Sequence, residues 1–252
     1  MLEYIEDEIT VILTVYRRKH LEKQLNCILS QTKKPYQVWI YQNESHINFA
    51  IPSELKKQYN ISVIHSRDKN FKFHGRFALP LLCDTEYTAV FDDDTMCGPR
   101  WLENCLDTSK RNNCIVGANG RTLKEGFEDK DTQHMISIGG GAPVDAETEV
   151  DFVGHCWFFK TAWCRNLWTD RPFSWDNGED IHLAASCQIY NQVKCYVPKM
   201  PANDTTLWGD TEAHLGNDQH ASFKKNDHAK LRADIIRYWH SRGWQPLFKR
   251  QQ

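Results

Sequence analysis

The chain has 252 residues, of which 40% are hydrophobic and 12% aromatic, so it can form a full core and is not a disordered polymer. Its 31 basic and 33 acidic residues give a net charge of only -2, so no overall field favours nucleic acid or an anionic membrane. The apolar run ITVILTV near the N-terminus is too short to span a bilayer and lacks a signal-peptide layout. We therefore expect no transmembrane segment and no nucleic-acid partner.

The cysteines favour a reducing compartment. There are nine of them, an odd number, and no two form a C-x-x-C pair. Reduced cysteines are small, well-buried packing residues. The sequence therefore predicts a cytoplasmic protein without a disulfide framework.

The first part of the chain alternates strand-like and helix-like segments. Residues 9–15 form a continuous apolar, largely β-branched run, which is typical of a strand buried on both faces. An amphipathic helix is expected over 20–30, and further strands over 37–41, 61–65 and 88–91. This alternation predicts an α/β fold with a mostly parallel central sheet and helices on both faces.

The second part is less regular. A helix should begin near Trp101, and residues 119–149 are polar and glycine-rich, which predicts a loop or insertion. Order should resume over 150–160, and a further helix should begin near Glu179. Residues 197–226 are again irregular, and a final amphipathic helix is expected over 227–242, ended by Gly243.

Three adjacent carboxylates, Asp92, Asp93 and Asp94, follow the expected strand 88–91. They would repel one another unless a cation neutralises them, and hard oxygen ligands suit Mn²⁺ or Mg²⁺. A solvated acidic turn is the alternative interpretation. Ligands of open parallel sheets bind beyond the carboxyl ends of the strands, and this placement favours a site.

The run TEYTAVFDDDTMCGPRWLENCL resembles the strand, D-x-D motif and following helix of family 2 glycosyltransferases. The resemblance implies a GT-A (Rossmann-like) fold that binds a nucleotide-sugar. It implies that Asp92 approaches the ribose or sugar and that Asp94 binds the metal bridging the diphosphate. Asp93 is the less constrained middle position of the nucleotide-sugar site.

Three further segments extend the resemblance. ITVILTVYRR resembles the opening strand and base-pocket turn of the family, and YQNES its second-strand signature, where Asn43 replaces the usual carboxylate. NFKFHGRF resembles the asparagine-glycine-arginine segment, although Lys72 occupies the glycine position. The nucleotide-sugar contacts implied by these segments are Thr14, Val15, Tyr16, Asn43, Asn70 and Arg76.

The segment WDNGEDIHL resembles the acidic G-E-D-x-x-L segment at the family's acceptor site. This implies that Asp180 is the catalytic base of an inverting transfer and that Glu179 holds the acceptor. A hydroxyl needs such a base because it is a poor nucleophile at neutral pH. Alternatively, both carboxylates only favour the start of a helix through its dipole. Trp175 and Trp157 are candidates for stacking on the acceptor sugar.

The irregular stretch HLGNDQHASFKK contains two histidines, His214 and His220. Family members close a mobile loop over the diphosphate, and such a loop can supply a metal or phosphate ligand. We take His220 as the candidate second metal ligand, with an ordinary surface histidine as the alternative.

These observations predict a single GT-A domain over residues 1–252, with a nucleotide-binding half of about 1–95 and an acceptor half of about 96–252. The predicted reaction moves a sugar, by best guess from a UDP-sugar, to a hydroxyl of a carbohydrate or glycoconjugate. A metal-dependent phosphohydrolase of the haloacid dehalogenase type is one alternative, but Met96 stands where that motif needs Thr or Val. A sugar nucleotidyltransferase would need a glycine-rich first loop. An inactive carbohydrate-binding module would not need both Asp94 and Asp180.

Overall fold

The computed structural model describes residues 3–44, 47–126 and 135–250. Its strands are β1 (Ile5–Val15), β2 (Gln37–Asn43), β3 (Ile61–Ser66), β4 (Thr85–Phe91), β5 (Cys114–Leu123), β6 (Met135–Gly139), β7 (Thr148–Val150), β8 (Phe152–Lys160) and β9 (Lys194–Val197). Its α-helices are α1 (Leu21–Leu29), α2 (Ser53–Gln58), α3 (Trp101–Asn112), α4 (Cys164–Leu167), α5 (Glu179–Asn191), α6 (His228–Ser241) and α7 (Leu247–Arg250).

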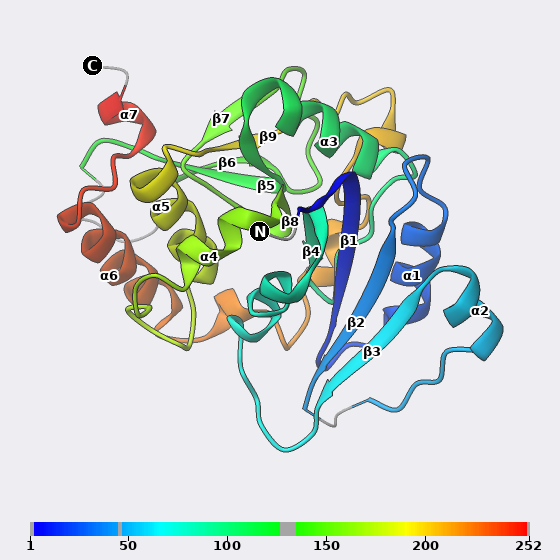
Figure 1. The fold of residues 1–252 in the computed structure, drawn as a ribbon. Coiled ribbons are helices and arrows are strands. Elements are labelled where there is room, and N and C mark those ends of the chain that lie inside the picture. The colour runs from blue at the N-terminus through cyan, green and yellow to red at the C-terminus, as the bar shows by residue number, and fades with distance from the viewer. Residues whose placement is uncertain (1–2, 45–46, 127–134, 251–252) are drawn as a thin grey trace.

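The strands form one sheet in the order β3-β2-β1-β4-β8-β5-β9-β7, and β6 pairs with β5. Strands β3, β2, β1 and β4 are parallel, whereas β8 is antiparallel to both β4 and β5. In Figure 1 the parallel strands lie side by side in one half of the molecule, and α4, α5 and α6 gather in the other half. The predicted α/β architecture is confirmed.

The central strands are covered on both faces. Val11, Ile12 and Leu13 of β1 are fully buried, as are Val90 and Phe91 of β4. Burial on both faces removes the need for polar alternation, which explains the continuous apolar run of β1. Strand β1 is thus the middle of the core, and its carboxyl end is held firmly beside those of β2 and β4.

The prediction of a loop over 119–149 is wrong for much of that range. Strand β5 continues to Leu123, and residues 135–139 and 148–150 form β6 and β7. The glycines misled the interpretation: a Cβ on Gly120 would lie 2.6 Å from Val197 and 2.7 Å from Val150, so glycine there allows close packing inside the sheet. Residues 127–134 lie outside the described part of the chain.

The predicted helices at 179 and 227–242 are confirmed as α5 and α6. Gly243 follows α6 with a φ of 103°, a left-handed conformation that favours glycine at a helix end. Trp239 of α6 and the following Trp244 are fully buried. Burial of these two indole rings anchors α6 beside α5.

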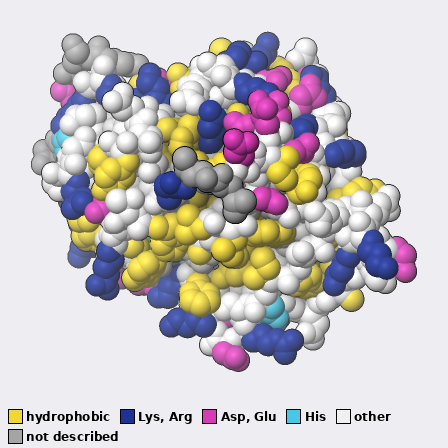
Figure 2. Space-filling model, in the orientation of Figure 1, with side chains coloured by type: hydrophobic (Ala, Val, Ile, Leu, Met, Phe, Trp, Pro, Cys, Tyr) yellow, Lys and Arg dark blue, Asp and Glu magenta, His cyan; other side chains and the backbone are white. Residues whose placement is uncertain are grey.

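The surface mixes both signs of charge around apolar side chains, which gather in the middle of the face that Figure 2 shows. In the part of the chain that the structure describes, no helix is both long and apolar enough to cross a membrane. All nine cysteines are free, and eight of them are buried. They act as small packing residues of the core.

Candidate functional site

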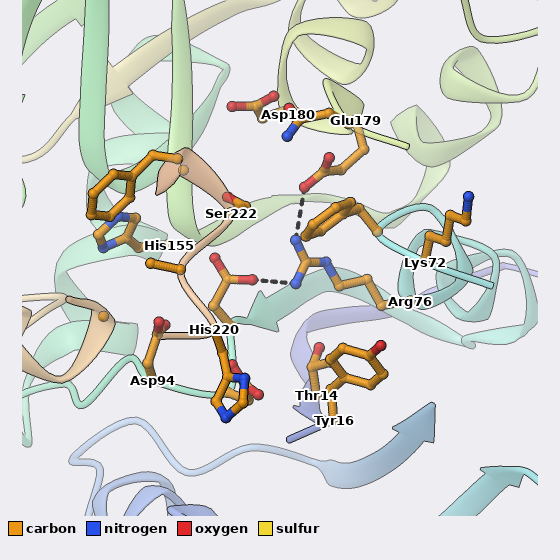
Figure 3. Close-up of a pocket in the computed structure, with 18 of the residues that line it drawn as sticks. Thr14, Tyr16, Lys72, Arg76, Asp94, His155, Glu179, Asp180, His220 and Ser222 are labelled. Atoms are coloured by element: carbon orange, nitrogen blue, oxygen red, sulfur yellow. Dashed lines mark hydrogen bonds and ion pairs between the residues drawn. The ribbon is translucent and has the colours of Figure 1, made fainter. Parts of the chain in front are cut away.

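A pocket of about 530 Å³ opens where the carboxyl ends of β1, β2 and β4 meet the start of α5. The walls of this pocket include most of the residues predicted for the site. These are Thr14, Tyr16, Asn43, Asn70, Arg76, Asp92, Asp93, Asp94, Trp157, Glu179, Asp180 and His220. Segments far apart in the sequence thus converge on one cavity, as Figure 3 shows.

Two of the predicted contacts lie outside the walls of this pocket. Val15 is 2% exposed and belongs to the core, because side chains alternate along a strand and Val15 faces away from Thr14 and Tyr16. The ring of Trp175 packs at 5.1 Å from the ring of His74 and stacks at 6.4 Å on Trp168. Trp175 therefore covers a neighbouring aromatic cluster.

The turn that carries the Asp triplet is fixed by main-chain hydrogen bonds. The amide of Asp92 donates to the carbonyl of His155 at 2.9 Å, and the side chain of Gln24 donates to the carbonyl of Asp92 at 2.6 Å. His155 itself has a left-handed φ of 69°. Helix α1 and strand β8 therefore hold the end of β4 from two sides.

Arg18 is the counter-ion of two carboxylates of the triplet. Its guanidinium lies 2.6 Å from Asp93 and 3.1 Å from Asp94, and it also forms a two-pronged contact of 2.8 Å with Asp218. Sequence reasoning missed this residue. The signal was the Arg17-Arg18 pair directly after β1, where a cationic side chain can reach the neighbouring strand end.

Burial and the nearby Asp92 raise the pKa of Asp94 to about 7, against the opposing effect of Arg18. Gly216 leaves space above this carboxylate, since a Cβ there would lie 3.1 Å from Asp94 Oδ2. Among the described residues no group of three or more His, Cys, Asp or Glu is arranged to hold a metal ion. A Mg²⁺ ion bound at Asp94 would therefore need waters and substrate phosphates as its other ligands.

Arg76 joins the two acidic motifs. Its buried guanidinium forms ion pairs with Asp92 and, at 2.9 Å, with Glu179, and it lies 4.7 Å from the ring centre of Trp157. In Figure 3 the guanidinium of Arg76 points toward Glu179, and a dashed line joins the two side chains. Burial and the adjacent Asp180 raise the pKa of Glu179 to about 7, although Arg76 opposes this shift. Glu179 thus combines a fixed position with a pKa near neutrality.

Asp180 has a different partner. Arg232 of α6 contacts both of its carboxylate oxygens, at 2.7 and 3.0 Å, and also donates to Asn177 at 3.0 Å. Burial acts to raise the pKa of Asp180, but the charge of Arg232 and the hydrogen bonds from Arg232 and from the amide of Ile181 together outweigh it, and the net shift is downward. Sequence reasoning missed Arg232, because a basic residue on an amphipathic helix carries no signal of its own.

Asn43 lies in a saturated hydrogen-bond network. Its side-chain amide donates to Asn70 Oδ1 at 3.0 Å and to the carbonyl of Lys72 at 3.2 Å, and its oxygen accepts from the amide of Phe71 at 3.0 Å. Asn70 in turn donates to the hydroxyl of Tyr16 at 2.9 Å. Asn43 therefore fixes the loop after β3, and Tyr16, Asn43 and Asn70 of this network all line the pocket.

His220 lies in a wall of the pocket and is exposed to solvent. Its amide donates to Asp218 at 2.8 Å, so the Arg18–Asp218 pair holds its segment over the Asp triplet. His214 is exposed and does not contribute to these walls. The structure thus brings one of the two histidines to the cavity.

The pocket lies beyond the carboxyl ends of the parallel β3-β2-β1-β4 strands, which is where open α/β sheets bind their ligands. The model of Glycosyl transferase family 2 matches residues 10–168, which is more than half of the chain. The chain belongs to glycosyl transferase family 2, and the predicted GT-A fold is confirmed. No curated protein matches it.

Among solved structures the chain is similar to TarS from S. aureus, with 14% sequence identity and a TM-score of 0.46. The similarity covers 76% of this chain and 36% of the TarS chain. The chain thus spans about a third of the length of that protein.

Proposed function

We propose that this chain transfers a sugar from a nucleoside diphosphate sugar, by best guess a UDP-sugar, to an acceptor hydroxyl with inversion at the anomeric carbon. The observation that carries the proposal is that Arg76 joins Asp92 of the strand-end triplet to Glu179 of the second acidic motif within one cavity. Family membership supports sugar transfer as the reaction class.

We propose that residues 1–252 act as one domain, with donor contacts mainly before about residue 95 and acceptor contacts after it. Thr14, Tyr16, Asn43 and Asn70 form the nucleoside end, with Asn43 shaping the loop. Asp92 and Arg76 contact the donor sugar, with Asp93 beside them, and Trp157 is the candidate for stacking on the acceptor sugar. Val15 supports the turn from the core side and Trp175 supports the neighbouring aromatic cluster, so both contribute through packing.

Asp94 would hold a Mn²⁺ or Mg²⁺ ion together with the donor diphosphate, and His220 is the candidate second ligand. Such an ion would neutralise charge that develops on the leaving diphosphate. Arg18 would then be free to turn from Asp94 toward phosphate oxygens, for which its planar fork is well suited.

The two carboxylates at the start of α5 have separate roles in the transfer. Asp180 accepts the proton of the acceptor hydroxyl while that oxygen attacks the anomeric carbon, and the bond from this carbon to the diphosphate oxygen breaks. Glu179 keeps Arg76 and the acceptor in place. The fork from Arg232 supports this role because it keeps Asp180 ionised and fixes its direction.

A second assignment of the base has an observation in its favour. The pKa of Glu179, raised to about 7, lies closer to neutrality than that of Asp180. A general base works best when its pKa is near the working pH. Substitution of each residue separately decides between them.

A thermal-shift panel of nucleoside diphosphates with and without Mn²⁺ tests the function as a whole. We expect UDP with Mn²⁺ to raise the melting temperature, because a ligand that binds only the folded state stabilises it. Stabilisation by another nucleotide would change the donor and keep the reaction class. Stabilisation by none would favour an inactive carbohydrate-binding module, and release of phosphate from a phosphomonoester would favour a phosphohydrolase. We also propose that the protein is cytoplasmic, because free cysteines are typical of a reducing compartment.

A further inference from the structure

One end of the pocket carries a cluster of basic side chains, of which the proposed transfer uses only Arg232, the partner of Asp180. The cluster consists of Arg121 of β5, Lys225, and His228 and Arg232 of α6, and all four line the cavity. Arg232 acts to lower the pKa of Arg121 and of His228, so these groups repel one another electrostatically. The charge of Asp180 opposes both shifts, but both of its carboxylate oxygens are already held by Arg232.

Arg121 is the least compensated member of this basic cluster. Its guanidinium donates to the side chain of Asn119 and, at 3.0 Å, to the carbonyl of Gly120. In the described part of the chain it has no carboxylate within ion-pair distance. Burial and the charge of Arg232 lower its pKa more than the charge of Asp180 raises it, so its surroundings disfavour the charged form.

The other cations of the cluster do not supply Arg121 with a counter-ion. Arg232 uses its fork on Asp180, and Lys225 lies over the ring of Phe73 at 5.8 Å. Among the described residues, Lys225 too has no carboxylate at ion-pair distance. At the Asp triplet, by contrast, the opposite charges are paired, because Arg18 and Arg76 contact its three carboxylates. The pocket therefore has an acidic donor end and a basic end beside Asp180.

We infer that the acceptor carries an anionic group, a phosphate or a carboxylate, which binds to Arg121 and Lys225. This inference rests on the proposed function and specifies its acceptor class. The guanidinium fork of Arg121 can bind two oxygens of such a group, and Lys225 can add a point charge. An acceptor held there would present a hydroxyl to Asp180, which lines the same cavity.

An exposed aromatic residue at this end, Phe223, suits a sugar or polyol body attached to the anion, because it lines the pocket and is 57% exposed. Phe152 is 1% exposed and is covered by the guanidinium of Arg232, which lies 5.2 Å from its ring centre. An exposed aromatic ring beside a cationic group can pack on the apolar face of a sugar while its charged substituent pairs with the cation.

Calorimetric titration of the full chain, saturated with UDP and Mn²⁺, with glucose 6-phosphate, glucuronate and glucose tests the inference. We expect at least one of the two anionic sugars to bind about tenfold or more tightly than glucose, because charge-assisted hydrogen bonds exceed neutral ones. A preference between them identifies phosphate or carboxylate as the recognised group. Arg121→Gln should lose about tenfold in affinity for the preferred anion.

The matched control is Arg111→Gln, which removes the same charge from α3, where Arg111 pairs with Glu147 away from the pocket. It should bind as the wild type does. If Arg121→Gln does not fold, as judged by circular dichroism, Lys225→Gln takes its place and should lose affinity in the same direction.

Equal binding of glucose and both anions, no measurable binding of either anion, or unchanged binding by the folded Arg121→Gln variant would overturn the inference. Loss of anion binding on saturation with UDP would overturn it as well, because the anion would then occupy the donor site. Failure of UDP to stabilise the protein is a separate result. It refutes the donor assignment, whereas the anion titration without UDP still reports on Arg121.

Discussion

Arg76 donates to Glu179 at 2.9 Å although the two residues lie 103 positions apart. The same guanidinium contacts Asp92, so one buried cation joins the end of β4 to the start of α5. Because removing one partner of a buried ion pair leaves an uncompensated charge, this junction is sensitive to substitution.

Replacing Asp94 should remove metal-dependent donor binding. Asp94→Ala deletes the carboxylate that would bind the cation beneath the diphosphate, so Mn²⁺ should no longer increase the thermal stabilisation by UDP. The control is Asp107→Ala on the exposed face of α3, which should keep the Mn²⁺ effect. A Mn²⁺-dependent shift of wild-type size in Asp94→Ala would show that the ion binds elsewhere.

Asp180→Asn should slow sugar transfer without weakening the binding of UDP. The amide keeps the size of the side chain but cannot accept the proton, so we expect kcat to fall by about 10² to 10⁴ while UDP binding persists. Glu179→Gln, measured beside it, should affect acceptor KM more than kcat. Wild-type kcat in Asp180→Asn together with a large loss in Glu179→Gln would transfer the role of base to Glu179.

Glu179 should make folding stability depend on pH. Its pKa is raised to about 7, so the folded state holds this proton at pH values where the unfolded chain has lost it. The contribution of Glu179 is therefore present at low pH and is lost as pH rises toward and through about 7. Relative to Glu179→Gln, the wild type should lose on the order of 2 kcal/mol between about pH 5 and about pH 8.

Urea unfolding of both proteins at the two pH values gives this difference, and Glu22→Gln on the exposed face of α1 serves as a surface control. Comparison with the variant cancels the contributions of His155 and Asp94, which also have raised pKa values. A difference between wild type and Glu179→Gln that stays constant with pH would contradict the shift.

Arg18→Gln should destabilise the metal-free protein more than Asp218→Asn does. The first change leaves Asp93, Asp94 and Asp218 without their shared cation and should cost about 1 to 3 kcal/mol. The second removes a partner whose side chain is 34% exposed and should cost about 0 to 1 kcal/mol. Thermal and urea unfolding measure both losses.

The exposed neighbour Arg17, replaced by Gln, is the matched control and should change stability by about 0.5 kcal/mol or less. Equal losses in Arg18→Gln and Asp218→Asn would mean that Arg18 acts through Asp218 alone and does not compensate the triplet.

Local patterns in the sequence determined the framework of the site. The run over 9–15, the carboxylates after β4 and the start of α5 at Glu179 each depend on neighbouring residues, so their positions could be predicted. The alternation of side chains along a strand also predicts that Val15 points to the opposite face from Thr14 and Tyr16. The strands over 119–123 and 135–139 could not be found this way, because their glycines are explained only by side chains from other strands.

Only the tertiary structure decided which charges meet. Arg18 pairs with Asp218 across 200 positions, and Arg232 pairs with Asp180 across 52. No periodic pattern links such residues, since their contact depends on how the sheet, α5 and α6 pack together. The sequence alone thus determined where the carboxylates stand along the chain. Their ionisation, and the uncompensated charge of Arg121, follow from burial and from partners that only folding brings within reach.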